Sequence, residues 1–225
     1  AVEVGEFYDN LVHEYESGKL NEKEREAFMR SNIAPLYQLD TSKMTYIGVT
    51  GTDGKTTTCT MIYHILQSLG HKPALISTVS AKIGDKEVST GFHTTTPSSQ
   101  ALFELLKQVE NENCTHVIIE STSHGLKMGR LAGIKFDAVG YTNITREHLD
   151  YHGTWENLVE AKALLMTEHL KDDGFAVLNY DDESYEKLKG RVGREIVYSM
   201  KADFMTEDEE DKADKTDEWL VAKNV

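Results

Sequence analysis

Short apolar runs alternate with stretches of helical periodicity along most of this 225-residue chain. Runs of strand length lie at 44–49, 74–79, 116–119, 137–142, 175–178 and 195–198. Between several of them the apolar positions recur with helical spacing, at 56–69, 98–109 and roughly 155–170. Strands that alternate with helices form βαβ units, which assemble into a parallel sheet with right-handed crossovers. The pattern therefore predicts an α/β fold with a mostly parallel sheet flanked by helices.

Local signals refine the ends of these elements. Ser98 and Thr154 precede two of the predicted helices, and a hydroxyl there caps a helix by accepting a main-chain N–H. Gly70 is expected to end the first helix. Gly84-Asp85 lies between two β-prone stretches and is typical of a two-residue hairpin turn. Trp219–Ala222 is a candidate for one more strand.

The two ends of the chain depart from this alternation. Residues 1–43 contain a candidate capping box, Asn21 with Glu24, and an apolar stripe of Phe7, Leu11, Val12 and Tyr15. We expect a helical N-terminal appendage at 1–43 that packs on a main domain at 44–225. After Ala202 the chain is rich in acidic residues, and a solvated loop is expected there.

The chain is strongly acidic, with 24 Lys and Arg against 38 Asp and Glu, a net charge of −14. This balance argues against nonspecific nucleic-acid binding and against attachment to an anionic membrane surface. Cys59 and Cys114 lack metal-ligand spacing and are expected to be free thiols in a reducing compartment. No apolar run approaches the length of a membrane span and no signal-peptide pattern opens the sequence, so we expect a cytoplasmic protein.

The stretch from Gly48 to Thr58 lies between the first apolar run and the first helical pattern. Strand, glycine turn and helix are the setting of a phosphate-binding loop, because glycines let main-chain N–H groups converge on an anion. Lys55 is placed to reach terminal phosphates, and the Thr56 hydroxyl suits Mg²⁺, which prefers oxygen ligands. Val49 replaces the first glycine of the strict G-x-x-x-x-G-K-[ST] pattern, so a glycine turn without a ligand is the alternative.

Polar residues follow two other predicted strands. Glu120 ends the run at 116–119, and a parallel sheet would place it beside the phosphate loop; a solvent-facing glutamate is the alternative. Many titratable groups typical of a site follow the run at 137–142, namely Arg146, Glu147, His148, Asp150 and His152. Lys162 shares the apolar face of the next helix, where it either covers apolar surface or is held near the site with its charge altered.

A series of motifs carries a resemblance to a known family. In chain order they are Gly-Thr-Asp-Gly-Lys-Thr-Thr at 51–57, His-Thr-Thr-Thr-Pro at 93–97, Glu-Ser-Thr-Ser-His-Gly-Leu at 120–126, Thr-Asn-Ile-Thr-Arg-Glu-His-Leu-Asp-Tyr-His-Gly at 142–153, Ala-Lys at 161–162 and Asn-Tyr-Asp-Asp at 179–182. Together they resemble the central ATP-binding domain of the Mur ligases over about residues 44–200. The Thr-Thr-Pro, Ser-His and His-Leu-Asp-Tyr-His-Gly elements are similar to the MurE type, which adds the third residue of the peptidoglycan stem.

The resemblance implies ATP-dependent amide formation on a P-loop-type fold, with UDP-N-acetylmuramoyl-dipeptide and an amino acid as substrates. A substrate carboxylate would attack the γ-phosphate to give an acyl phosphate and ADP, and an incoming amine would then displace phosphate. The implied ATP-binding residues are Gly51, Thr52, Asp53, Gly54, Lys55, Thr56 and Thr57. The implied catalytic residues are Lys55, Glu120, His148 and Lys162. The implied substrate-binding residues are Thr95, Thr96, Thr122 and Arg130.

The resemblance also implies two Mg²⁺ ions, with Thr56, Glu120 and His148 among their ligands. Lys162 matches the lysine that the family carries as a carbamate, formed from neutral lysine and CO₂. That group would be an anionic oxygen ligand for the second Mg²⁺. Two positions depart from the family: Thr122 stands where Ser is more usual, and Asp53 stands where Asn is more usual and adds negative charge near the phosphates.

Other parts of the family have no counterpart here, namely its long N-terminal nucleotide domain, its late adenine-contacting Asn motif and its C-terminal domain. We therefore expect a fragment or a reduced relative, incomplete at the C-terminal side of the central domain, that cannot complete catalysis alone. Two other hypotheses stay open, a folylpolyglutamate synthase-like amide ligase and a non-catalytic nucleotide-binding module. The amino acid that is added and the oligomeric state are not determined by the sequence.

Overall fold

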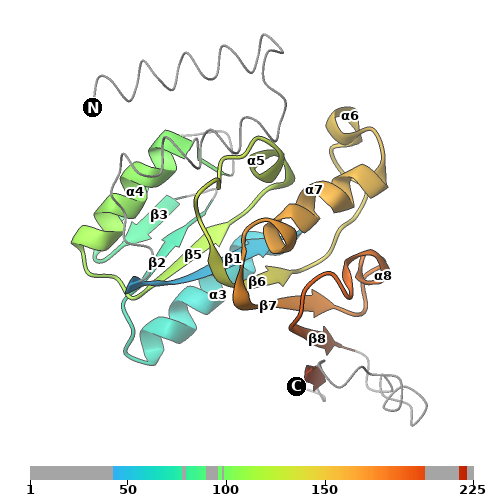
Figure 1. Ribbon diagram of the computed structural model, residues 1–225. Coiled ribbons are helices and arrows are strands. Elements are labelled where there is room, and N and C mark those ends of the chain that lie inside the picture. The colour runs from blue at the N-terminus through green and yellow to red at the C-terminus, as the bar shows by residue number, and fades with distance from the viewer. Residues whose placement is uncertain (1–42, 78–79, 90–95, 98, 201–217, 222–225) are drawn as a thin grey trace.

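The computed structural model describes residues 43–77, 80–89, 96–97, 99–200 and 218–221 (Figure 1). Within them, nine strands form one sheet in the order β4-β3-β2-β5-β1-β6-β7-β8-β9. The strands are β1 Thr45–Thr50, β2 Pro73–Ile76, β3 Ser80–Ile83, β4 Lys86–Ser89, β5 His116–Glu120, β6 Phe136–Tyr141, β7 Leu170–Asn179, β8 Glu195–Ser199 and β9 Glu218–Val221. The helices are α3 Lys55–Ser68, α4 Ser99–Asn111, α5 Ser123–Lys127, α6 Leu149–His152, α7 Trp155–Thr167 and α8 Tyr185–Leu188.

The sheet is mostly parallel, as the alternation of strands and helices predicts. From β2 through β5, β1, β6, β7 and β8 to β9, each neighbouring pair of strands runs parallel. The exception is the edge formed by β3 and β4, which pair antiparallel with the Gly84-Asp85 turn between them. The predicted hairpin is therefore confirmed, and the candidate strand at Trp219–Ala222 corresponds to β9.

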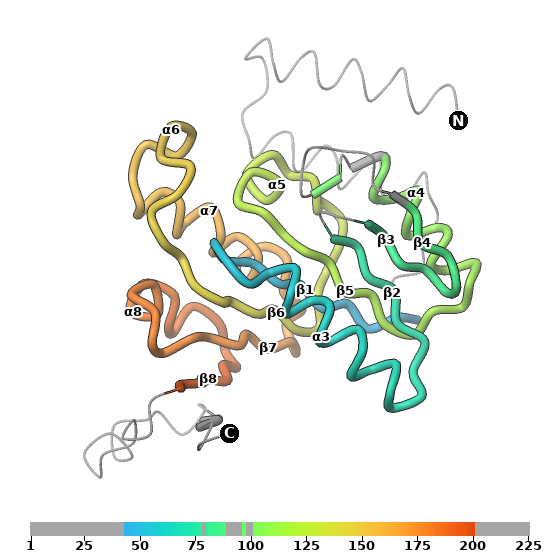
Figure 2. The backbone as a smooth tube through the Cα atoms, turned by 180° about the vertical axis from the view of Figure 1, so that it is seen from behind, coloured from blue at the N-terminus to red at the C-terminus, as the bar shows by residue number. Residues whose placement is uncertain are grey.

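Helices cover the two faces of the sheet unequally. Within the described residues, the larger core lies on the face covered by α4, α5, α7 and α8, and α3 packs against a smaller cluster over β2, β5 and β1 on the other face (Figure 1). That smaller cluster consists of Val49, Cys59, Tyr63, Leu75 and Ile118. Figure 2 shows the backbone from behind, with α5 and α6 again toward the same end of the sheet. The turns that follow β5 and β6 therefore meet at one edge.

The helix boundaries agree with their sequence signals where the structure describes them. The Thr154 hydroxyl accepts the Asn157 N–H at 3.2 Å and caps α7. Gly70 takes a left-handed φ of 83° just after α3, which suits a residue without Cβ. Ser98, residues 1–42 and the acidic stretch at 201–217 lie outside the described residues, so the predictions made for them stay predictions.

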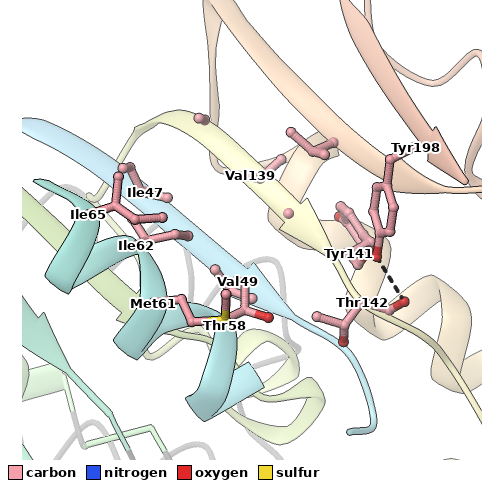
Figure 3. Close-up of a pocket in the computed structure, with 13 residues that line it drawn as sticks. Ile47, Val49, Thr58, Met61, Ile62, Ile65, Val139, Tyr141, Thr142 and Tyr198 are labelled. Carbon is pink, nitrogen blue, oxygen red and sulfur yellow. Dashed lines mark hydrogen bonds between the residues drawn. The ribbon is translucent and has the colours of Figure 1, made fainter. Parts of the chain in front are cut away.

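An apolar groove of about 400 Å³ runs beside α3, between that helix and strands β6, β7 and β8 (Figure 3). Met61 and Ile65 of α3 form one wall, and Val139 of β6 lies on the other. Ile65 is 55% exposed although it is aliphatic. Thr58 and Thr142 line the groove close to the phosphate loop. Among the described residues, the face of the sheet that α3 covers is thus packed on one side of that helix and open on the other.

We expect the buried Ile118 of β5, which packs under α3, and the exposed Ile65 of α3 to differ sharply in their contribution to stability. Ile118→Ala removes a fully buried side chain under α3 and should lower the free energy of unfolding by about 2–5 kcal/mol. Ile65→Ala removes a side chain that is 55% exposed, so it should lower the free energy of unfolding by less than about 1 kcal/mol. Urea unfolding of both variants measures this, and equal losses would show that the groove wall is packed in solution.

Candidate functional site

The phosphate loop takes a conformation that two glycines permit. Gly51 follows β1 with a φ of 149°, and Gly54 precedes α3 with a φ of 80°. A Cβ on Gly51 would lie 1.9 Å from the Thr142 hydroxyl oxygen and 2.9 Å from the Asn143 carbonyl oxygen. The segment after β6 therefore presses directly on the loop, and only glycine fits at this contact.

The same segment fixes the loop through hydrogen bonds. The Thr52 N–H donates to the Asn143 carbonyl at 2.7 Å, and the Asp53 N–H donates to the Asn143 side-chain oxygen at 3.0 Å. The Thr142 hydroxyl donates to the Asp53 carbonyl at 2.7 Å. Two of the predicted ATP-binding residues thus use their own N–H groups to hold the loop. The first N–H groups of α3, at Lys55, Thr56 and Thr57, have no acceptor within the helix and suit an anion.

Two predicted ligand-binding side chains lie at the start of α3. The Lys55 ammonium donates to the Gly51 carbonyl at 3.0 Å and to the Thr52 carbonyl at 2.7 Å, so it lies across the loop. The Thr56 hydroxyl donates to a carboxylate oxygen of Glu120 at 2.9 Å. Glu120 is 2% exposed and stands opposite Val49 in the pairing of β5 with β1. The strand register thus places Glu120 beside the phosphate loop, as expected, and the solvent-facing alternative is wrong.

Lys162 is buried at the same loop. Its side chain reaches from α7 to donate to the Gly51 carbonyl at 2.7 Å and to a Glu147 carboxylate oxygen at 3.2 Å, and the residue is 1% exposed. Burial lowers the pKa of the Lys162 amine to about 8, although the neighbouring Glu147 carboxylate opposes that shift. The amine is therefore partly neutral in mildly alkaline solution. A lysine that merely covers apolar surface is the wrong interpretation.

His148 does not join this group in the structure. Its backbone has a left-handed φ of 50°, its side chain is 53% exposed, and its Nε2 lies 3.8 Å from a Glu147 oxygen. Among the described residues, no three His, Cys, Asp or Glu side chains are close enough together to hold a metal. Thr56 and Glu120 supply the hard oxygen donors that Mg²⁺ prefers and fit one ion. The two other implied metal ligands, His148 and Lys162, are both near Glu147 instead.

Three of the predicted substrate-binding residues form a second cluster. The hydroxyl groups of Thr96 and Thr122 lie 2.9 Å apart, and the Arg130 guanidinium donates to the Thr96 carbonyl at 2.6 Å. The Thr122 hydroxyl also caps α5 by accepting the Gly125 N–H at 3.1 Å. A Cβ on Gly125 would lie 2.6 Å from Cβ of Thr96, so the glycine is needed for this approach. The remaining member of the set, Thr95, lies outside the described residues.

The other titratable groups after β6 do not converge on the loop. Arg146 pairs with the exposed Glu183 at 2.7 Å, and Asp150 is exposed. His152 is buried, and its Nε2 lies 3.0 Å from the Ser123 hydroxyl oxygen. Burial, reinforced by the nearby His124, lowers the pKa of His152 to about 4. Of the titratable side chains that the sequence groups in this segment, Glu147 is bonded to Lys162 at the phosphate loop, whereas Arg146, Asp150 and His152 lie elsewhere.

A family model described as the Mur ligase middle domain matches residues 49–221. The chain belongs to the Mur ligase family. A UDP-N-acetylmuramyl-tripeptide synthetase of Borrelia garinii subsp. bavariensis is 39% identical over 192 residues, covering 83% of this chain and 37% of the relative.

Other relatives carry related names. A UDP-N-acetylmuramoyl-L-alanyl-D-glutamate–2,6-diaminopimelate ligase of Cytophaga hutchinsonii is 41% identical over 69% of this chain and 30% of its own. The corresponding L-lysine ligase of Staphylococcus haemolyticus is 41% identical over 72% of this chain and 33% of its own. The chain thus spans about a third of the length of these relatives. Because both amino-acid specificities occur at the same identity, similarity does not decide between them.

Solved structures share this fold, and one of them is of the same ligase type. A 2,6-diaminopimelate ligase of this type superposes with a TM-score of 0.63 at 27% identity, covering 81% of this chain and 36% of that one. Escherichia coli FolC, solved with DHPP and ADP, has a TM-score of 0.57 at 17% identity, covering 75% and 46%, and so shares the fold alone. None of the helices in the described part of this Mur ligase domain is long and apolar enough to cross a membrane.

We expect Gly51→Ala to be strongly destabilising. The added methyl group would overlap the Thr142 hydroxyl and crowd the Asn143 carbonyl at a φ that L-residues rarely adopt, a strain of about 1–3 kcal/mol or more. Urea unfolding measures the loss. Gly193→Ala is the matched control, because nothing lies within 4 Å of its added Cβ. Adding Thr142→Ala should recover only part of the loss, since the Asn143 carbonyl remains; full recovery would contradict the backbone clash.

Proposed function

We propose that this chain is the ATP-binding core of a MurE-type ligase, which adds the third residue to UDP-N-acetylmuramoyl-dipeptide in peptidoglycan precursor synthesis. The observation that carries the proposal is the arrangement around Gly51. A phosphate loop, the Thr56–Glu120 pair and the buried amine of Lys162 meet there. Relatives at about 40% identity are named as ligases of this reaction. The proposed reaction would use this arrangement to bind the phosphates of ATP and to neutralise their charge.

Each residue has a physical role in the proposed reaction. The loop N–H groups and the start of α3 bind the triphosphate of ATP, and Lys55 turns from the loop carbonyls to the transferring phosphoryl group. The substrate carboxylate attacks the γ-phosphorus, which gives an acyl phosphate and ADP. The amine of the amino acid then attacks the acyl carbon, so that an amide forms and phosphate and a proton leave.

Thr96, Thr122 and Arg130 are proposed to bind the muramoyl-peptide. The Thr96 and Thr122 hydroxyl groups are hydrogen-bonded to each other and the Arg130 guanidinium donates to the Thr96 carbonyl, so the three residues form one cluster. A guanidinium offers a fork of donors that suits a carboxylate or phosphate. The position of this cluster at the carboxyl end of β5 would hold the substrate carboxylate near the phosphates.

Mg²⁺ and a carbamate complete the proposal. Thr56 and Glu120 would hold one Mg²⁺, and His148 with a carbamate on Lys162 would hold a second; bound Mg²⁺ neutralises charge on the phosphates. The carbamate forms when the neutral amine of Lys162 attacks CO₂ and loses a proton. Burial favours that step because it raises the neutral fraction of the amine. His148 would have to turn inward from its half-exposed position.

The alternatives are less well supported. FolC shares the fold at 17% identity, whereas the solved diaminopimelate ligase reaches 27%, and relatives named as muramoyl-peptide ligases are about 40% identical over about 70% of the chain. A nucleotide-binding module without chemistry has no need for a lysine that is buried at the phosphate loop with a lowered pKa. The muramoyl-peptide ligase therefore accounts for more of the observed site.

We expect the chain to bind ATP in a Mg²⁺-dependent manner. Lys55→Met removes a cation from the loop and should weaken Mg·ATP binding by about 10- to 100-fold in isothermal titration calorimetry. Lys86→Met is the control, because it removes an equal charge from an exposed pair with Glu112.

The proposed function also predicts which substrate carboxylate accepts the phosphoryl group. In a polypeptide of the relatives' full length, ADP should be released with UDP-N-acetylmuramoyl-dipeptide and an amino acid, and not with a folate. The reverse preference, or ATP affinity that ignores both Mg²⁺ and Lys55→Met, would overturn the proposed function.

We also expect ¹³CO₂ to label Lys162. At a fixed concentration of dissolved CO₂, the carbamate signal in ¹³C NMR should rise from about pH 7 to about pH 9, because the neutral fraction of an amine grows as the pH passes its pKa. Lys162→Met should lack the signal, while Lys189→Met, which removes an exposed lysine, should keep it. A signal unchanged by Lys162→Met would assign the carbamate elsewhere and contradict the role given to this lysine.

A further inference from the structure

A buried histidine joins the segments that carry the site residues. His152 is the last residue of α6, is 3% exposed, and is given no role in the reaction proposed above. Its ring Nε2 lies 3.0 Å from the hydroxyl oxygen of Ser123, which is also buried and opens α5. Ser123 follows Thr122, so this hydrogen bond links the segment after β6 to the segment after β5.

The main chain of His152 makes two more of these connections. Its N–H donates to the His148 carbonyl at 2.9 Å, and its carbonyl accepts the Asn157 side-chain N–H at 2.9 Å. Asn157 lies in the first turn of α7, the helix that carries Lys162. His148 has a left-handed backbone that non-glycine residues adopt only where the surroundings hold it. His152 is therefore bonded to α5, to α7 and to the backbone of His148 at once.

We propose that His152 is a positioning residue, which fixes the loop bearing Glu147 and His148 against α5 and α7 and so holds the Glu147 carboxylate at the buried amine of Lys162. This role rests on the proposed function for its consequence in metal binding. Between His148 and His152, the residues Leu149, Asp150 and Tyr151 are all exposed, and the nearest buried residue on the β6 side of His148 is Ile144. Outer residues that orient metal ligands often matter nearly as much as the ligands.

The chemistry of the ring suits this position. The pKa of His152 is lowered by burial and by the nearby His124 and Lys127, so the ring is neutral near neutral pH. A neutral ring adds no positive charge next to the buried amine of Lys162. Within the described residues its Nδ1 is buried without a hydrogen-bond partner, so the ring is anchored through Nε2 alone.

Because the ring has one hydrogen bond among the described residues, to Ser123, substitutions that keep or remove that bond can distinguish positioning from simple packing. The side-chain amide of glutamine reaches the place of Nε2, the amide of asparagine reaches only that of Nδ1, and phenylalanine fills the space without a hydrogen bond. If the ring positions the loop through Ser123, glutamine replaces it and phenylalanine does not. If the ring only packs against Tyr151 and His124, phenylalanine replaces it best.

The first measurement is hydrogen exchange in the 225-residue chain without nucleotide. The amides at positions 151 and 152, which donate to the His148 carbonyl, should exchange about tenfold faster in His152→Phe, His152→Asn and Ser123→Ala, and at the wild-type rate in His152→Gln. The double variant Ser123→Ala with His152→Phe should be no faster than either single one. Wild-type exchange in His152→Phe, or no recovery with glutamine, would overturn the positioning role.

The second measurement is Mn²⁺ binding with an ATP analogue, followed by electron paramagnetic resonance under conditions where every variant is folded. His152→Phe and Ser123→Ala should weaken Mn²⁺ binding by about 10- to 100-fold, and His152→Gln should restore it. Unchanged Mn²⁺ affinity together with faster exchange would show that the loop is positioned for something other than metal. Absence of Mn²⁺–nucleotide binding in the wild-type chain would overturn the proposed function, while the exchange result would still decide the role of His152.

Discussion

The contact between the Gly51 carbonyl and the buried amine of Lys162 is the interaction on which the site depends. The Gly51 carbonyl accepts a hydrogen bond from this amine, and Thr142 and Asn143 of the segment after β6 pack against the same glycine. Burying an amine costs free energy unless it has partners, and here the partners are the loop and Glu147. The position of α7 and the shape of the loop are thereby fixed together, so neither can move without exposing an unpaired group.

The order of three central strands explains why these groups meet. β5, β1 and β6 are neighbours and run parallel, so their carboxyl ends lie at one edge of the sheet. Glu120 comes from the first, the phosphate loop from the second, and Asn143 with Glu147 from the segment after the third. These residues are far apart in sequence, and parallel pairing alone brings them within hydrogen-bonding distance of one loop. The fold thus supplies the site with both a rigid base and short connecting segments.

Sequence periodicity predicted which strand ends meet but not how side chains turn within the loops. The strands, the hairpin and the place of Glu120 followed from alternation, because the register of a parallel sheet leaves little choice once the order is known. Asn143 and Thr142 were missed as supports of the phosphate loop, since their role is visible only when β6 lies next to β1. Arg146 was grouped with the site, yet Glu183 and the Trp155 ring hold it at the surface. The contacts of a loop side chain depend on residues that are distant in sequence, so they cannot be read from the local pattern.

Two cationic side chains meet at the Gly51 carbonyl. Lys55 and Lys162 both donate to the Gly51 carbonyl, so two cationic groups share one acceptor, and Lys55 contributes to lowering the pKa of the more buried amine. A carbamate on Lys162 would reverse these interactions, because its negative charge would attract Lys55 and repel Glu147. Lys162 is enclosed, whereas the Glu147 side chain is about a quarter exposed and can turn toward water. Glu147 is therefore the side chain that would turn away if the proposed carbamate formed.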